Sequence, residues 1–238
     1  MKDSLHSMRF PGETPAYRSA RNDLLKAEIE LRRKIEEVAA RRRELPLGGE
    51  PPVDYTFHEE AGPNSVRAVK LSELFQEGQT SVVIYSFMYG PNMKQACSSC
   101  TSILDGLDRV AQHATQRIGL AVVAKSPIER VSAFARERNW TNLRLLSSAN
   151  NMYNRDYNAE TLKGEQLPAL NVFVRRDGRI HHFYSAELLY SASEPGQDNR
   201  HVDLIWPLWA LFDLTPEGRG SFNPRLNYEA VAAAEQLR

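Results

Sequence analysis

The segment Ser81–Phe87 restricts the possible folds of this chain more than any other part of the sequence. It is β-branched and almost wholly apolar, as expected of a strand that is buried on both faces of a sheet. Residues 118–124 have the same character, and a helical pattern separates the two segments. Strands that alternate with helices in this way indicate an α/β protein.

Shorter segments extend the same alternation. The pattern predicts helices and strands in the order strand 53–57, helix 71–75, helix 127–139, strand 143–146, strand 169–174 and strand 180–184. Between the last two strands, Asp177-Gly178 is typical of a hairpin turn. We therefore expect a central mixed β-sheet flanked by helices, mostly parallel, with an antiparallel edge.

An amphipathic helix precedes this domain. Thr14 suits the N-cap and Pro15 the first helical position. Apolar residues then recur at helical spacing, at positions 24, 31, 35 and 38. We expect a helical extension over residues 1–46 and a second domain over residues 47–238. The apolar stripe offers two contacts, one with its own domain and one across a homodimer.

Composition excludes several classes of protein. The 30 basic and 30 acidic side chains balance, so we expect no nucleic-acid partner. No apolar run approaches the roughly 20 residues that a spanning helix needs, so we expect no membrane partner. The N-terminal sequence has no apolar core of a secretory signal, and we expect a cytoplasmic protein.

The chain has only 2 cysteines, Cys97 and Cys100, in a C-x-x-C motif. A bridge between them closes a very small loop and could hardly brace the fold, so their chemistry is of more interest. The motif follows the buried strand and opens an apolar helical pattern, which places Cys97 at a helix N-terminus. There the helix dipole and the N–H groups of Ser98 and Ser99 favour a thiolate.

This position predicts different roles for the two thiols. Cys97 is the candidate attacking thiolate. Cys100, one turn inside the helix, is the candidate resolving thiol that breaks a mixed disulfide. Two inert buried thiols are the alternative interpretation of the motif.

Metal binding is a weaker interpretation. A structural zinc site usually has four ligands, and the two cysteines have no matching histidine pair. His181 and His182 are adjacent on a predicted strand, so they point to opposite faces, one inward and one into solvent. We expect no metal ion and no cofactor.

Pro168 directly precedes the strand that starts at Ala169. In thioredoxin-like folds a cis-proline loop abuts the C-x-x-C helix and presents backbone to the substrate. The order of elements here resembles that layout, which makes Pro168, Ser98 and Ser99 candidate substrate-binding residues. The sequence does not decide whether the Leu167–Pro168 bond is cis.

The sequence resembles, over nearly its whole length, a bacterial family of thioredoxin-like proteins catalogued as a domain of unknown function. The matching stretches are residues 85–91, 97–100, 105–108, 168–173 and 213–219. The resemblance implies a thioredoxin-like fold with an N-terminal helical extension. Well-known thioredoxins have an aromatic residue where Ala96 stands and Gly-Pro where Ser98-Ser99 stand, so recognition of an electron donor stays open.

Together these observations predict a thiol–disulfide oxidoreductase. Its partners would be a protein or small-molecule disulfide and an unidentified electron donor. One alternative is a peroxiredoxin-like thiol peroxidase, in which Cys97 passes through a sulfenic acid. Pro91 and Lys94 depart from the Pro and Thr that precede the peroxiredoxin cysteine, which argues against a standard peroxide pocket. The other alternative is a non-catalytic interaction protein.

Overall fold

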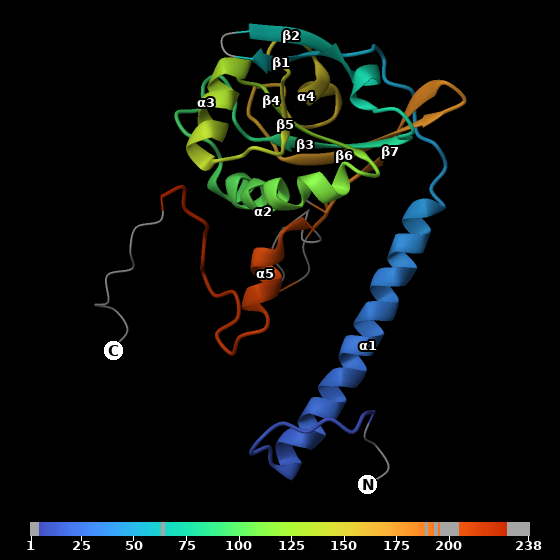
Figure 1. The fold of residues 1–238 in the computed structure, drawn as a ribbon, viewed down its shortest axis with the longest axis vertical. Coiled ribbons are helices and arrows are strands. Elements are labelled where there is room, and N and C mark those ends of the chain that lie inside the picture. Colours follow the sequence, from blue (N-terminus) through green and yellow to red (C-terminus); the bar gives the residue numbers. More distant parts are fainter. Residues whose placement is uncertain (1–4, 63–64, 189, 193–194, 196–204, 228–238) are drawn as a thin grey trace. The chain divides into compact units, whose positions relative to one another are not determined.

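The computed structural model describes residues 5–62, 65–188, 190–192, 195 and 205–227 (Figure 1). The chain divides into two compact units, Met1–Pro46 and Leu47–Arg238. Among the helices in the described residues, none combines the length and apolar character needed to cross a membrane.

The first unit contains the predicted N-terminal helix, α1, which spans Pro15–Arg43. The Thr14 hydroxyl accepts a hydrogen bond from the Tyr17 N–H at 3.1 Å, so the predicted N-cap is confirmed. Ion pairs at helical spacing line the exposed surface, for example Arg32 with Glu36 at 3.3 Å. Each such exposed pair contributes only a few tenths of a kcal/mol, about 0.3–0.5 kcal/mol.

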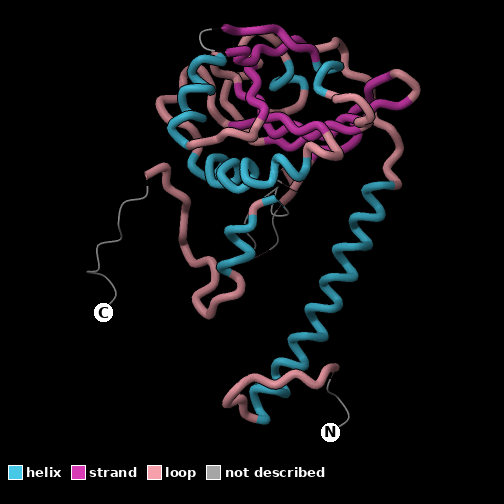
Figure 2. Tube along the Cα trace, in the orientation of Figure 1, coloured by secondary structure: helices cyan, strands magenta, loops and turns pink. Residues whose placement is uncertain are grey.

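The second unit is built on a seven-stranded sheet in the order β2-β1-β5-β4-β3-β6-β7. Figure 2 shows the strands in magenta, with helices in cyan beside them. The strands are β1 Thr56–Gly62, β2 Ser65–Lys70, β3 Ser81–Phe87, β4 Gly119–Ala124, β5 Arg144–Ser147, β6 Ala169–Arg176 and β7 Arg179–Ser185. The helical elements are η1 Leu71–Leu74, α2 Ser98–Ala114, α3 Ile128–Arg138, α4 Tyr153–Asp156 and α5 Pro207–Phe212.

The connection β3-α2-β4 joins two parallel strands, and β6 and β7 add to the other side of β3 as an antiparallel hairpin. This β4-β3-β6-β7 order, with a helix between the parallel strands, is a thioredoxin-like fold. The fold that the sequence resemblance implied is therefore confirmed. The expected N-terminal helix and mixed sheet are present as well.

The expectation of a mostly parallel sheet is wrong, since among the described strands only β3–β4 and β4–β5 pair in parallel. The difference comes from the β1–β2 hairpin, which lies later in the chain than the strand expected at 53–57. The charged residue Glu59 stands at a buried position of β1, so the alternation of apolar residues does not predict this strand. Its side chain is buried against Arg67 and Arg144, with hydrogen bonds of 2.7 and 2.8 Å, so its charge is paired.

Strand β3 divides the core into two clusters. Tyr85 and Phe87 belong to the cluster under α2 and α3, whereas Val82 and Ile84 belong to the cluster under η1 and α4. The predicted burial of this strand on both faces is confirmed. The C-terminal end of β3 is followed by the loop that leads to the start of α2.

The edge strand β7 carries the two histidines on opposite faces, as predicted. The His182 ring packs against Phe173, with ring centroids 5.4 Å apart, and its Nε2 lies 2.9 Å from the Asn171 amide oxygen. His181 instead lies with Nδ1 3.3 Å from the backbone oxygen of Gly48.

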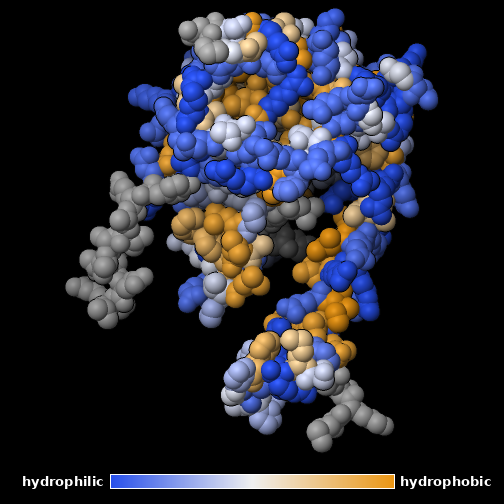
Figure 3. Space-filling model, viewed as in Figure 1, coloured by the Kyte–Doolittle hydropathy of each residue, from blue (hydrophilic) through white to orange (hydrophobic). Residues whose placement is uncertain are grey.

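After the hairpin, α5 begins at Pro207. Proline suits this position because the first residue of a helix does not need its N–H for a hydrogen bond within the helix. Trp206 and Trp209 are buried in the α2-side core. Figure 3 shows apolar side chains gathered on the surface around α5. Leu211 and Leu214 are among the exposed ones.

Candidate functional site

Cys97 lies where the loop after β3 meets α2. It is the N-cap residue of this helix, as the sequence predicted. Its N–H donates to the Met88 backbone oxygen at 3.1 Å, and its own carbonyl accepts from the Thr101 N–H at 2.9 Å and the Thr101 hydroxyl at 2.8 Å. The backbone of Cys97 is therefore held from both sides.

The sulfur of Cys97 sits among hydrogen-bond donors. The Cys100 N–H points at it from 3.4 Å. The Cys100 thiol and the N–H groups of Cys100 and Ser99 together lower the pKa of Cys97 to about 6, although partial burial of the side chain opposes them. Both cysteines are free, and Cys97 is partly exposed. The site thus presents a thiolate at neutral pH.

Cys100 has the opposite character. Its side chain is only 2% exposed, and its pKa is raised by its hydrogen bond to Cys97 and by burial. The pair therefore consists of one accessible, acidic thiol and one sequestered, protonated thiol. This is the asymmetry that the sequence predicted for an attacking and a resolving cysteine.

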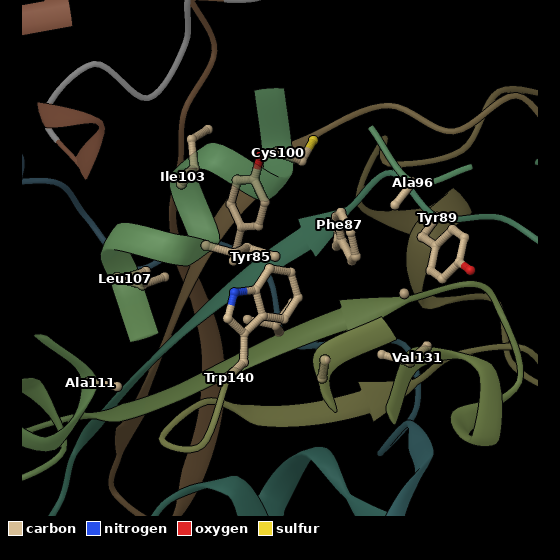
Figure 4. Close-up of a cluster of buried hydrophobic side chains, with 14 of the residues drawn as sticks. Tyr85, Phe87, Tyr89, Ala96, Cys100, Ile103, Leu107, Ala111, Val131 and Trp140 are labelled. Carbon is tan, nitrogen blue, oxygen red and sulfur yellow. The ribbon is translucent and has the colours of Figure 1, made fainter. Parts of the chain in front are cut away.

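Tyr85 is a neighbour of Cys100 to which the sequence analysis gave no role at the site. Figure 4 shows its hydroxyl end directed toward Cys100. The ring is fully buried, and the hydroxyl lies close enough to the thiol to lower the pKa of Cys100, against the larger effects that raise it. Only the alternation of side chains along β3, combined with the placement of α2, brings the two together.

Arg130 in α3 fixes the loop that precedes Cys97. Its guanidinium donates to the backbone oxygens of Gly90, at 3.0 Å, and of Met93. The same group lies over the Tyr89 ring, 4.2 Å from the centroid. Sequence reasoning missed this residue, because nothing local distinguishes one helical arginine from another.

The cysteine motif adjoins a cavity of about 740 Å³. Ala96 and Ser98 line it directly, and Lys94 and Phe134 add a cation and an aromatic ring. Ser98 therefore borders space beside the motif, while Ser99 contributes its backbone N–H to the Cys97 sulfur.

Pro168 lies at the same end of the sheet. Ala169 pairs with Ser86, one residue before the end of β3, and Pro168 directly precedes Ala169. The Leu167–Pro168 bond is trans, unlike the proline of the thioredoxin layout. The structure brings the four motif residues together. Within the described part of the chain, Pro168 shares no hydrogen bond with them.

The stretch 105–108, which carries part of the sequence resemblance, is structural. Asp105 accepts a hydrogen bond from the Trp140 indole at 2.8 Å and pairs with Arg138. Asp108 is buried and accepts from the N–H groups of Asn142 and Leu143, at 2.8 and 3.2 Å. Both carboxylates hold α2 against the α3–β5 connection.

We find no group of three or more His, Cys, Asp and Glu side chains arranged to hold a metal ion in the residues that the structure describes.

A thioredoxin-like sheet with a free dithiol at the start of its α2 helix defines the class of this protein. Residues 8–233 match the family described as bacterial protein of unknown function (DUF899). Because the match covers nearly the whole chain, the protein belongs to this family. Among curated proteins, none matches the chain.

Several solved structures are similar to this chain at a distance. Plasmodium vivax 2-Cys peroxiredoxin in its reduced form is 18% identical with a TM-score of 0.45, covering 68% of this chain and 93% of that one. Enterococcus faecalis AhpC is 11% identical with a TM-score of 0.46, covering 69% of this chain and 91% of that one. The peroxidoxin BcpB of Mycobacterium tuberculosis is 17% identical with a TM-score of 0.43, covering 68% of this chain and 94% of that one. These likenesses are too distant to carry an inference about activity.

Proposed function

We propose that this protein is a thiol–disulfide oxidoreductase in which Cys97 attacks and Cys100 resolves. The observation that carries the proposal is the asymmetry of the pair. Cys97 is the partly exposed N-cap with a pKa lowered to about 6, and Cys100 is buried with a raised pKa. An attacking thiol is most effective when its pKa lies near the ambient pH.

The reaction follows from this arrangement. The Cys97 thiolate attacks one sulfur of a substrate disulfide, forming a mixed disulfide and releasing the other sulfur as a thiolate that takes up a proton. Cys100 then loses its proton and attacks the Cys97 sulfur, which frees the second substrate thiol. Two electrons pass from the dithiol to the substrate, and a thiol reductant must return the Cys97–Cys100 disulfide to the dithiol.

The surroundings would support these steps. Tyr85 lies where it can hydrogen-bond the Cys100 thiolate as that forms. Ser98, within the motif, and Pro168, at the start of β6, are the candidate contacts for substrate backbone. The cavity beside Ala96 and Ser98 offers room for a bound disulfide.

The test uses Ellman's reagent, a disulfide whose two halves are coloured on release. Reduced wild-type protein should release both halves, because resolution by Cys100 frees the half held on Cys97. The Cys100→Ser variant should release one half and retain the other as an adduct on Cys97, detectable by mass spectrometry. The Cys97→Ser variant should react far more slowly, since only the buried thiol remains.

Other outcomes would point to the alternatives. Rapid release from Cys97→Ser would contradict the assigned roles. A Cys100→Ser variant that reacts with hydrogen peroxide and is then labelled by dimedone, while the wild type reduces no disulfide, would indicate a thiol peroxidase. A pair that forms no reversible disulfide in glutathione buffers would leave the fold as a binding scaffold.

A further inference from the structure

The Tyr85 hydroxyl is a buried polar group whose neighbour is a sulfur atom of the cysteine pair. Tyr85 is 0% exposed, and Cys100 belongs to the same core cluster. Within the described part of the chain, the hydroxyl makes no hydrogen bond to any other group. It is directed toward Cys100 (Figure 4). Buried hydroxyls are rarely left without a partner, so the Cys100 sulfur is the group that this hydroxyl is placed to bind.

The Tyr85 hydroxyl can serve only as a donor in this position. Burial, and after it the neighbouring Cys100 thiol, raise the pKa of Tyr85 well above its ordinary value. The hydroxyl therefore keeps its proton at neutral pH. It can donate a hydrogen bond to a thiolate, but it cannot take the proton from Cys100.

The core around Cys100 provides donors and not a base. Among the described residues, the buried carboxylates are those of Glu59 and Asp108. Groups outside the cysteine site bind both of them, two arginines in the case of Glu59 and backbone N–H groups before β5 in the case of Asp108. The Cys100 thiolate must therefore form in apolar surroundings, where it depends on hydrogen bonds for its stability. The Tyr85 hydroxyl and the Met88 N–H are the groups that lower the pKa of Cys100.

We propose that Tyr85 is a catalytic residue of the resolving step, in which its hydroxyl donates to the Cys100 sulfur and sets how fast the mixed disulfide on Cys97 is broken. This role rests on the proposed oxidoreductase function. Cys100 loses its proton to solvent, and its sulfur forms a bond with the Cys97 sulfur. The bond between Cys97 and the substrate sulfur breaks, and the departing substrate thiolate takes up a proton. The Tyr85 proton stays on its oxygen throughout.

Stopped-flow kinetics of the reduced full chain with excess Ellman's reagent separates the two steps. The attack by Cys97 releases the first half at a rate that depends on reagent concentration, whereas resolution by Cys100 releases the second half at a rate that does not. Tyr85→Phe removes one oxygen atom and keeps the ring in the core. The first phase should therefore be unchanged in this variant, and the second should be slower.

The size of the effect follows from the lost hydrogen bond. A hydrogen bond to a charged group corresponds to about one to two pH units of thiol acidity. Since a less acidic thiol is also the better nucleophile once it is ionised, nearly half of this loss, on a logarithmic scale, is recovered. The second phase should be slowed about three- to ten-fold near pH 7, and the midpoint of its pH dependence should move upward by about one unit or more. A change in packing alone would slow the step without moving that midpoint.

Tyr153→Phe is the matched control. Tyr153 is equally buried, but it belongs to the core cluster on the other side of β3, so both phases should be unchanged. The proposed role is overturned if Tyr85→Phe resolves at the wild-type rate, if both phases slow alike, or if Tyr153→Phe slows the second phase as much. In each of these cases the wild type still releases both halves, and the oxidoreductase function stands. A wild type that releases only one half would overturn that function and the role of Tyr85 with it.

Discussion

Replacing Cys100 with alanine should raise the pKa of Cys97. In the wild type the largest cause of the lowered pKa is the hydrogen bond from the Cys100 thiol, followed by burial, which opposes it, and then by the N–H groups of Cys100 and Ser99. Cys100→Ala removes the thiol and keeps both N–H groups. The pKa should therefore rise from about 6 without reaching that of a free thiol.

The size of the change follows from the energy of that hydrogen bond. A hydrogen bond to a charged group contributes about 1.5–3 kcal/mol, and about 1.4 kcal/mol corresponds to one pH unit. The pKa of Cys97 should thus rise by about one to two pH units in Cys100→Ala. At pH 7 the thiolate fraction would fall from about nine-tenths to between about a half and a tenth.

Ultraviolet absorbance of the thiolate, titrated from acid to alkaline pH, measures this directly. Cys97 is the only thiol left in Cys100→Ala, so its titration is unambiguous, and the pH dependence of iodoacetamide alkylation gives a second reading. Ser98→Ala is the matched control, because it changes a neighbouring side chain and keeps every donor that lowers the pKa of Cys97. An unchanged midpoint in Cys100→Ala, or a wild-type midpoint near about 8.5, would refute the reasoning.

Three further predictions concern stability. Since the pKa of Cys97 is lower in the folded protein than in the unfolded chain, its thiolate stabilises the fold above about pH 8.5, and this contribution is lost as the pH falls through about 6. The difference in unfolding free energy between wild type and Cys97→Ser, from urea titrations, should therefore shrink from pH 9 to pH 5. Arg130→Ala removes the donors to the loop carbonyls and the contact with the Tyr89 ring, and should lower the unfolding free energy in urea by about 1–3 kcal/mol; an unchanged midpoint would contradict the assigned contacts. Asp108→Ala should cost about 2–4 kcal/mol in thermal unfolding, because it leaves partly buried N–H groups before β5 unpaired; a loss below about 0.5 kcal/mol would show that they find other partners.

Local patterns in the sequence were enough to predict the centre of the fold. An apolar β-branched run is expected to be buried on both faces, and this places β3 in the interior of the sheet. A cysteine motif directly after it, at the start of an amphipathic helix, puts Cys97 at the N-cap. The hairpin turn and the N-cap at Thr14 follow from equally short-range rules.

Contacts between distant segments decided the rest. Glu59 belongs to a strand only because Arg67 and Arg144 pair with its carboxylate there. Its sequence neighbours do not reveal that pairing. The β1–β2 hairpin, and with it the antiparallel majority of the sheet, therefore escaped prediction.

The same distinction holds for the site. Helix N-terminus physics predicted the direction of the Cys97 pKa from the sequence alone. The Tyr85 hydroxyl beside Cys100 and the Arg130 guanidinium on the cysteine loop depend on how β3, α2 and α3 pack. Periodicity determines which face a side chain occupies, but only tertiary packing determines what that face meets. For this protein the sequence determined the candidate cysteine pair, and the tertiary structure determined the groups that surround it.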